Sequence, residues 1–319
     1  VAEQEGVPYV DLCAITSAKY EKFGETKVNY MFYKDKIHTS AFGARVNCES
    51  AIEGIRSCPG LALAQCLKPV EVDTITGNTR KKGRPVVFLI GDSTVKNKDK
   101  DNDGMWGWGS LFADFFKKNK VSVENHAKAG RSSRTFLDEG RWDKVYNALQ
   151  PGDYVFIQFG HNDGGDINVG KARGTLKGNG DESKVFLMEK DKRYQVIYSY
   201  GWYIRKFIGD CKEKGATPIV LSHTPRNKWN SDSTIVERCN ESYGLWAKEA
   251  AEQAGAYFID LNEISAKKIE AIGKKGVAEM FEGDHTHTSK KGAYMNAKSV
   301  AEGLKNSECP LRKALKKKF

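Results

Sequence analysis

The sequence predicts an α/β fold in which a parallel sheet is covered by helices on both faces. Short apolar segments of strand length alternate with longer amphipathic stretches through residues 85–319, a pattern typical of parallel sheets. The candidate chemical groups follow directly after these segments. Ligands of open α/β sheets bind at the carboxyl ends of the strands, so the same alternation also predicts where a functional site lies.

Five apolar segments are the candidate strands of this sheet: residues 86–90, 121–123, 154–159, 218–221 and 257–259. None approaches the ~20 apolar residues that cross a bilayer, so we expect neither a membrane span nor a membrane partner. Apolar residues make up 39% of the chain and charged residues 29%. This composition supplies a large core and excludes wholesale disorder.

An internal repeat precedes the predicted sheet. Residues 2–56 match residues 251–305 at a fixed offset of 249, with about 23 identities in about 55 positions. The shared landmarks include a DxxHTSxxGA motif that begins at Asp35 and again at Asp284. We therefore expect residues 1–68 to be a partial duplicate of the C-terminal part of the 85–319 domain, without its front half. Alone this module has one strand and no sheet, so we expect it to dock on the larger domain or on a partner chain.

The segment between the two copies has the composition of a linker. Residues 69–84 are rich in Thr, Gly, Asn, Lys and Arg and predict a linker.

The net charge of +10 favours a polyanionic partner. Because the basic residues are spread out and the dense cluster 312–318 is a terminal tail, we expect no nucleic-acid partner, and an acidic polysaccharide fits equally well. The seven cysteines contain no CxxC pair, which argues against a zinc site.

Three candidate groups follow the first three strands. Ser93 stands after the first strand, where it can present its hydroxyl at the strand tip, although a helix N-cap is an alternative. Gly130 follows the second strand and can offer its N–H to a developing oxyanion. Asn162 follows the third strand, and its amide can donate to the same oxyanion. Each segment alone is equally compatible with an ordinary turn.

A fourth group lies near the end of the chain. Asp284 precedes His287 by three residues, close enough to hold the imidazole in the tautomer that takes a proton from serine. His285 is also compatible with a metal, but no further ligand cluster accompanies it, so we expect no metal. Residues 99–104 copy the first half of an EF-hand loop, yet Ser110 stands where a bidentate Glu is needed. We interpret them as a solvated loop.

Together these segments resemble the sequence blocks of the SGNH, or GDSL-type, hydrolases. Ser93 matches block I, Gly130 block II, Asn162 block III, and the Asp284/His287 pair block V. Over about residues 84–316, the segments GDST, AGRSSRTF, FGHNDGG and DHTHTSKKGA are similar to the rhamnogalacturonan acetylesterases of that family. The resemblance implies a three-layer α/β/α sandwich with a flavodoxin-like five-stranded sheet. It also implies removal of O-acetyl groups from pectic polysaccharide without a metal or other cofactor.

We therefore predict a serine esterase, secreted or periplasmic, acting on an acetylated acidic polysaccharide. Ser93 is the expected nucleophile, His287 the general base and Asp284 the group that orients it. The N–H groups of Ser93 and Gly130 and the side chain of Asn162 are the expected oxyanion hole. The pair Asp35/His38 is the alternative partner for Ser93, but Asp284/His287 follow Ser93 in the same domain.

Five further residues are candidates for binding the polysaccharide. Trp106, Trp108 and Trp229 could stack on sugar rings, with core packing as the alternative. Arg131 and Arg134 flank the expected oxyanion glycine and could meet galacturonate carboxylates, with a structural role as the alternative. Two rival functions stay open. One is an SGNH esterase acting on acetylated xylan, another glycan or a lipid ester; the other is a non-catalytic glycan-binding protein.

Overall fold

The structure is a computed structural model that describes residues 1–29, 31–32, 36–39, 41–67, 83–96 and 104–319. The chain divides into two compact units, Val1–Thr74 and Ile75–Phe319. Most of the expected linker 69–84, Asp35 and most of the acidic loop 99–104 lie outside the described residues. No helix in the described part of the chain is both long and apolar enough to cross a membrane.

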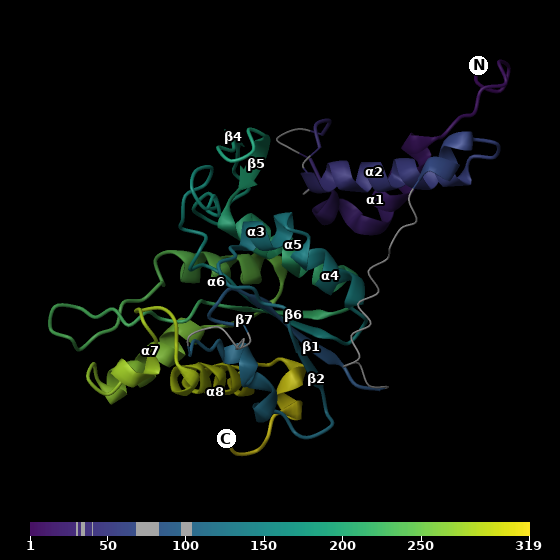
Figure 1. Cartoon of the computed structure of the whole chain (residues 1–319). Helices are drawn as coiled ribbons and strands as arrows, with labels where there is room; N and C mark the ends of the chain where they lie inside the picture. The colour runs from purple at the N-terminus through teal and green to yellow at the C-terminus, as the bar shows by residue number, and fades with distance from the viewer. Residues whose placement is uncertain (30, 33–35, 40, 68–82, 97–103) are drawn as a thin grey trace. The chain divides into compact units, whose positions relative to one another are not determined.

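A five-stranded parallel sheet forms the centre of the larger unit (Figure 1). Its neighbouring strands are all parallel, in the order β2-β1-β3-β6-β7. These strands are β1 (Val86–Gly91), β2 (Ser122–Asn125), β3 (Tyr154–Gln158), β6 (Thr217–Leu221) and β7 (Tyr257–Ile259). The five predicted strands and their parallel arrangement are confirmed.

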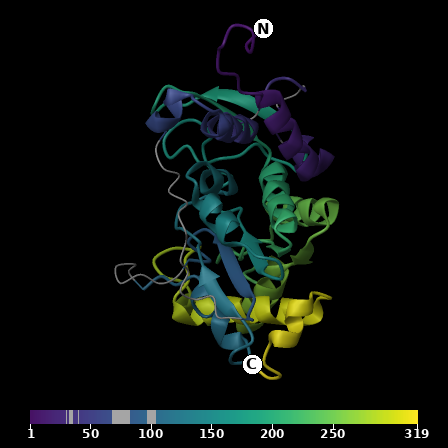
Figure 2. The same cartoon turned by 90° about the vertical axis from the view of Figure 1, so that its right-hand side faces the viewer.

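Helices cover both faces of this sheet (Figures 1 and 2). One face carries α3 (Ser133–Asp138), α4 (Arg141–Ala148), α5 (Tyr200–Glu213) and α6 (Tyr243–Ala254). The other carries α7 (Leu261–Ile272) and α8 (Lys290–Asn306), with the short 3-10 helices η2 (Trp108–Ser110), η3 (Phe112–Phe115), η4 (Ala278–Met280) and η5 (Pro310–Ala314) beside them. The predicted three-layer α/β/α sandwich is confirmed.

The central strand β1 shows why the sequence forms three layers. Val86, Phe88 and Ile90 are buried in the core beneath α3 to α6. Val87 and Leu89 are buried in the second core, beneath α8 and the 3-10 helices. Successive side chains of a strand point to opposite faces, so a strand covered on both sides is apolar at every position. Each such burial contributes about 1.5–3 kcal/mol, which fixes the strand between its two layers.

An antiparallel hairpin in the larger unit was not predicted. It joins β4 (Ser183–Leu187) to β5 (Tyr194–Tyr198) as a separate two-stranded sheet. Val185 and Leu187 are each 44% exposed, and Tyr194 is 77% exposed. Because the hairpin satisfies its own backbone hydrogen bonds without burying a continuous apolar run, it has only a weak hydrophobic signal.

The smaller unit contains α1 (Leu12–Asn29), α2 (Ala41–Ser57) and η1 (Ala62–Cys66). Among the described residues of this unit no strand is present, so the one strand expected here, at residues 8–10 as the counterpart of β7, is not formed. Two local features nevertheless recur at the offset of the sequence repeat. The bridge between Phe32 and Thr39 has its counterpart 249 residues later, between Phe281 and Thr288. The side chain of Asp11 caps α1 by accepting from Ala14 N at 2.9 Å, and the aspartate that precedes α7 caps that helix in the same way.

Candidate active site

The turn after β1 holds Ser93 at the carboxyl end of the sheet. Oδ1 of Asp92, the residue before it, accepts hydrogen bonds from the N–H and the hydroxyl of Thr94, at 2.9 and 2.8 Å. The same Thr94 hydroxyl accepts from Gln158 Nε2 at 2.7 Å, and Gln158 Oε1 accepts from the indole of Trp108 at 2.7 Å. This buried chain of hydrogen bonds ties the turn to β3 and to η2, so the position of Ser93 is set by the core.

The loop before α8 brings an imidazole to that serine. Nε2 of His287 lies 2.9 Å from Ser93 Oγ, and Nδ1 of the same ring lies 2.6 Å from Asp284 Oδ2. Next to His287, Thr288 exchanges two hydrogen bonds with the backbone of Trp106, at 2.7 and 2.8 Å. The loop is therefore fastened to the segment that follows the Ser93 turn. Serine, imidazole and carboxylate form one continuous series of hydrogen bonds, the arrangement that activates a serine nucleophile.

The carboxylate of Asp284 is held in its charged form. Its partial burial raises the pKa, but hydrogen bonds from the N–H and ring of His287 and from the N–H of Thr286 outweigh burial and lower the pKa of Asp284 to about 2. A permanent negative charge therefore faces Nδ1 at neutral pH. It keeps the proton on Nδ1 and leaves Nε2 free to accept one from Ser93.

Asp163 fastens together the loops that carry Gly130 and Asn162. Its Oδ1 accepts from the N–H and the hydroxyl of Ser133, at 3.0 and 2.5 Å, and its Oδ2 accepts from Gly160 N at 3.0 Å. Burial raises the pKa of this carboxyl to about 7 against the effect of these bonds. The Asn162 amide donates to the backbone oxygen of Arg131, the residue after Gly130, at 3.0 Å. The structure thus brings the two expected oxyanion donors to adjacent positions.

Gly130 and Gly160 occupy positions that other residues fit poorly. Gly130 has φ of +75°, in the left-handed region that favours glycine. A Cβ on Gly160 would lie 2.6 Å from the ring of His223, and its φ is +137°. Gly160 thus lets the ring of His223 approach the backbone after β3, whereas Gly130 is favoured by its φ alone.

The predicted polysaccharide-binding residues divide into two groups. Trp108 and Arg134 are only 0% and 1% exposed. Trp108 donates to Gln158 within the core, and the guanidinium of Arg134 donates to the carbonyl oxygens of Ile167 and Ala172. The structure does not present either side chain to solvent, and both serve packing, the alternative considered for them.

The other three predicted binding residues are partly exposed. Trp106 lies beside the His287 loop, with the Lys290 ammonium 5.2 Å from its ring. Trp229 donates to the side chain of Asn227, at 2.7 Å. Arg131 forms an ion pair at 2.9 Å with Glu139, whose carboxylate Arg141 shares at 2.6 Å.

Sequence reasoning missed four side chains near this edge. Arg173 donates to Gly130 O over 3.4 Å, which places a guanidinium beside the expected oxyanion hole. His161, His223 and Arg226 line a cavity of about 330 Å³. His161 adjoins Asn162 and was visible in the sequence, but the loop of His223 and Arg226 had no catalytic motif to mark it.

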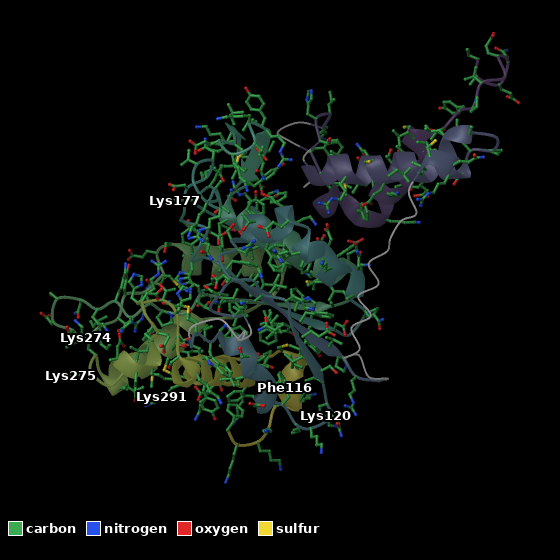
Figure 3. All side chains as sticks on the ribbon, in the orientation of Figure 1. Phe116, Lys120, Lys177, Lys274, Lys275 and Lys291 are labelled. Atoms are coloured by element: carbon green, nitrogen blue, oxygen red, sulfur yellow. The ribbon has the colours of Figure 1, made fainter. Side chains whose placement is uncertain are left out.

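The described residues hold no metal-ligand cluster, and their positive charge is dispersed. Among the residues that the structure describes, no group of three or more His, Cys, Asp or Glu side chains is placed to hold a metal ion. Lysines come from separate parts of the larger unit, with Lys120 at one end and Lys274 and Lys275 at the other (Figure 3). The positive charge is therefore not confined to one stripe.

A parallel α/β/α sandwich with a serine, an imidazole and a carboxylate at its carboxyl edge defines a class of hydrolases. Residues 89–294 match the model of the GDSL-like Lipase/Acylhydrolase family. The match spans most of the chain, so the protein belongs to that family and is a carboxylic ester hydrolase.

Curated relatives agree with this assignment, and a solved structure shares the fold. The chain is 33% identical over 218 residues to a rhamnogalacturonan acetylesterase of Emericella nidulans, covering 68% of this chain and 84% of the relative. It is 32% identical over 236 residues to a probable rhamnogalacturonan acetylesterase, YesY, of Bacillus subtilis, covering 72% and 96%. The crystal structure of Bacillus subtilis YxiM shares the fold, with a TM-score of 0.56 at 24% identity. That match covers 70% of this chain and 56% of YxiM.

Proposed function

We propose that this protein is a serine esterase that removes O-acetyl groups from a plant cell-wall polysaccharide, specifically a pectic rhamnogalacturonan. The observation that carries the proposal is the 2.9 Å contact between His287 Nε2 and Ser93 Oγ, continued by the 2.6 Å contact between Nδ1 and Asp284. A non-catalytic glycan-binding protein has no need of a serine, an imidazole and a carboxylate aligned in this way.

The reaction proceeds through an acetyl-enzyme. Ser93 Oγ attacks the acetyl carbonyl carbon while His287 Nε2 takes the hydroxyl proton, and Asp284 stabilises the imidazolium that results. Collapse of the tetrahedral intermediate breaks the bond to the sugar oxygen, which receives the proton from His287. Water then attacks the acetyl group with His287 again as the base, and acetate leaves while Ser93 recovers its proton.

The oxyanion of each tetrahedral intermediate is held by three donors. These are the N–H groups of Ser93 and Gly130 and the side-chain amide of Asn162, whose second N–H is available beyond its bond to Arg131 O. Such donors act in the transition state, where the carbonyl oxygen gains charge, and loss of one costs about a hundredfold or more in rate.

The choice of polysaccharide follows from the relatives. Three curated relatives that are at least 32% identical are named as rhamnogalacturonan acetylesterases, one of them as a probable one. A polymeric cell-wall substrate is reached outside the cytoplasm, so we propose a secreted or periplasmic location. The net charge of +10 suits a polyanion of this kind.

The experiment that tests the proposal compares acetate release from three polymers. Purified protein is incubated with acetylated rhamnogalacturonan, the same polymer after alkaline deacetylation, and acetylated xylan, with the Ser93→Ala variant in parallel. We expect acetate from native rhamnogalacturonan, none from the deacetylated polymer, and none in the variant. Release from xylan at an equal or higher rate would transfer the proposal to a different glycan, and full activity of Ser93→Ala would overturn the mechanism.

We further propose that the smaller unit is a partial duplicate of the C-terminal part of the larger one. Support comes from the sequence repeat and from contacts that recur at the same offset, such as the bridges Phe32–Thr39 and Phe281–Thr288. The unit carries His38 but no counterpart of the Ser93 segment. In this proposal catalysis belongs to residues 75–319, and the smaller unit has no active site of its own.

A further inference from the structure

A cavity of about 330 Å³ lies next to the proposed active site. Loops after β3 and β6, together with the segment that leads into α6, supply its wall. His161, His223 and Arg226 contribute side chains to it. The volume is at the small end of the range for ligand pockets, which suits a single sugar residue rather than a long segment of polymer.

The cavity is attached to the catalytic loops on two sides. His161 directly precedes Asn162, the proposed oxyanion donor. On the other side, Asn227, the residue after Arg226, donates its N–H to the carbonyl oxygen of His285 at 2.7 Å. A sugar residue in the cavity would therefore lie close to the ester that Ser93 attacks.

The two arginines of the wall differ in their charge compensation. Arg238 is paired with Glu263 at 2.7 Å and with Glu270 at 2.6 Å. Arg226 makes no side-chain ion pair or hydrogen bond with any described residue, and its Nε is buried without a partner. The acidic residue of the wall, Glu237, is exposed and forms no ion pair with Arg226 within the described part of the chain. Buried guanidinium N–H groups are normally hydrogen-bonded, so Arg226 indicates that an acceptor belongs here.

The two histidines are neutral and offer polar groups to hydroxyls. Burial is the largest cause that lowers the pKa of His223 to about 4 and the pKa of His161 well below its ordinary value. Nδ1 of His223 lies 3.0 Å from Thr224 O, so it carries the ring proton and Nε2 is an acceptor. Nε2 of His161 contacts the Thr224 hydroxyl at 3.1 Å, and its Nδ1 is buried without a partner.

We propose that this cavity binds a uronate residue of the substrate, with its carboxylate on Arg226 and its hydroxyls at His161 and His223. A carboxylate matches the planar donor array of a guanidinium and supplies the missing acceptor. The inference rests on the proposed function, because it locates the acidic sugar of that substrate in the cavity. It also moves the recognition of the carboxylate away from Arg131, which is ion-paired with Glu139, and from Arg134, which is buried out of reach of a ligand.

The test compares a charged substrate with its neutral form. Acetylated rhamnogalacturonan is assayed before and after methyl esterification of its carboxyl groups, and the preference is the ratio of the two kcat/KM values. We expect the wild type to prefer the charged polymer. Arg226→Gln lowers this preference about tenfold or more, mainly through KM, because the contact is made in the ground state and the transition state alike. Arg226→Lys, which keeps the charge without the planar fork, restores part of it.

Lys228→Gln is the matched control, because it removes an exposed positive charge two residues away in the same loop. It keeps the wild-type preference if Arg226 acts at short range. Each preference is a ratio measured on one preparation, so partial unfolding of a variant does not imitate the effect. A wild-type preference in Arg226→Gln, or an equal loss in Lys228→Gln, would overturn the assignment. Failure of the proposed function looks different: an aryl acetate is hydrolysed, but neither form of the polymer releases acetate.

Discussion

Replacement of Asp284 by asparagine tests the role of the carboxylate with almost no change in shape. Oδ1 of Asp284 accepts from the N–H groups of Thr286 and His287, at 2.6 and 2.7 Å, and Oδ2 faces Nδ1 of His287 at 2.6 Å. Asparagine has one oxygen and one NH₂ group for these three contacts. Each orientation of the amide therefore puts an NH₂ group where the carboxylate has an acceptor oxygen.

The geometry decides which orientation prevails. If the oxygen keeps both backbone N–H groups, the NH₂ group faces Nδ1, the ring proton moves to Nε2, and His287 cannot take the proton of Ser93. The opposite orientation leaves two N–H groups without an acceptor, at about 1 kcal/mol each, so about 2 kcal/mol in total disfavours it by roughly thirtyfold. It also lacks the charge that stabilises the imidazolium. We therefore expect Asp284→Asn to reduce kcat about a thousandfold to ten-thousandfold, leaving a measurable rate.

The assay is steady-state hydrolysis of an aryl acetate near pH 8, with kcat and KM determined separately. We expect the loss in kcat, because binding of a small ester does not involve Asp284. Glu279→Gln is the control, since it removes an exposed carboxylate from the segment just before the loop. We expect its kcat to be nearly that of the wild type. An Asp284→Asn enzyme with more than a tenth of the wild-type kcat would refute the proposed role of the carboxylate.

Four further outcomes are expected. Ser93→Ala reduces turnover about a millionfold, measured as acetate release; substantial residual turnover would mean another nucleophile. Dialysis against EDTA leaves aryl acetate hydrolysis unchanged, because the nucleophile and its base are side chains; a loss restored by zinc or calcium would contradict this. Because the pKa of His223 is about 4 in the folded protein, this residue takes up a proton only in the unfolded chain as the pH is lowered from 6.5 to 5. The free energy of unfolding therefore decreases by about 2 kcal/mol over this range. Measured by urea unfolding, the decrease is smaller in His223→Gln, and an equal decrease in the variant would exclude His223 as its source. His38→Ala keeps esterase activity while His287→Ala abolishes it, and the reverse result would assign the base to the smaller unit.

The sheet could be predicted from the sequence because its strands are buried on both faces. Val86 to Ile90 are all 0% exposed, so β1 is apolar at every position and stands out from the amphipathic helices. Ser93, Gly130 and Asn162 were found for a related reason, whereas Asp284 and His287, in the loop before α8, were found from their spacing and from the family resemblance. Parallel strands end at one edge of the sheet, so polar residues that directly follow them are brought together by the fold.

Side chains that depend on tertiary packing could not be placed in this way. Trp108 and Trp106 are two residues apart in a glycine-rich stretch, yet one is in the core and the other lies beside the loop of His287. Arg134 begins a short helix whose position over the sheet turns its guanidinium toward backbone carbonyls. The cavity around Arg226 depends on three loops that are distant in sequence, so no local pattern marks it.

The repeat shows how a motif can persist for packing rather than for chemistry. A Cβ on Gly43 in α2 would collide with the carbonyl oxygen of Met31, and a Cβ on Gly292 in α8 would collide with that of Met280. These pairs lie at the repeat offset of 249. In both units, therefore, the helix that follows the DxxH motif packs directly on the segment that precedes the motif. Glycine at this contact is required by backbone approach alone, whatever the chemistry nearby. Packing therefore explains this shared glycine without any catalytic task for His38, and the DxxH motif of the smaller unit is by itself no evidence for a second active site.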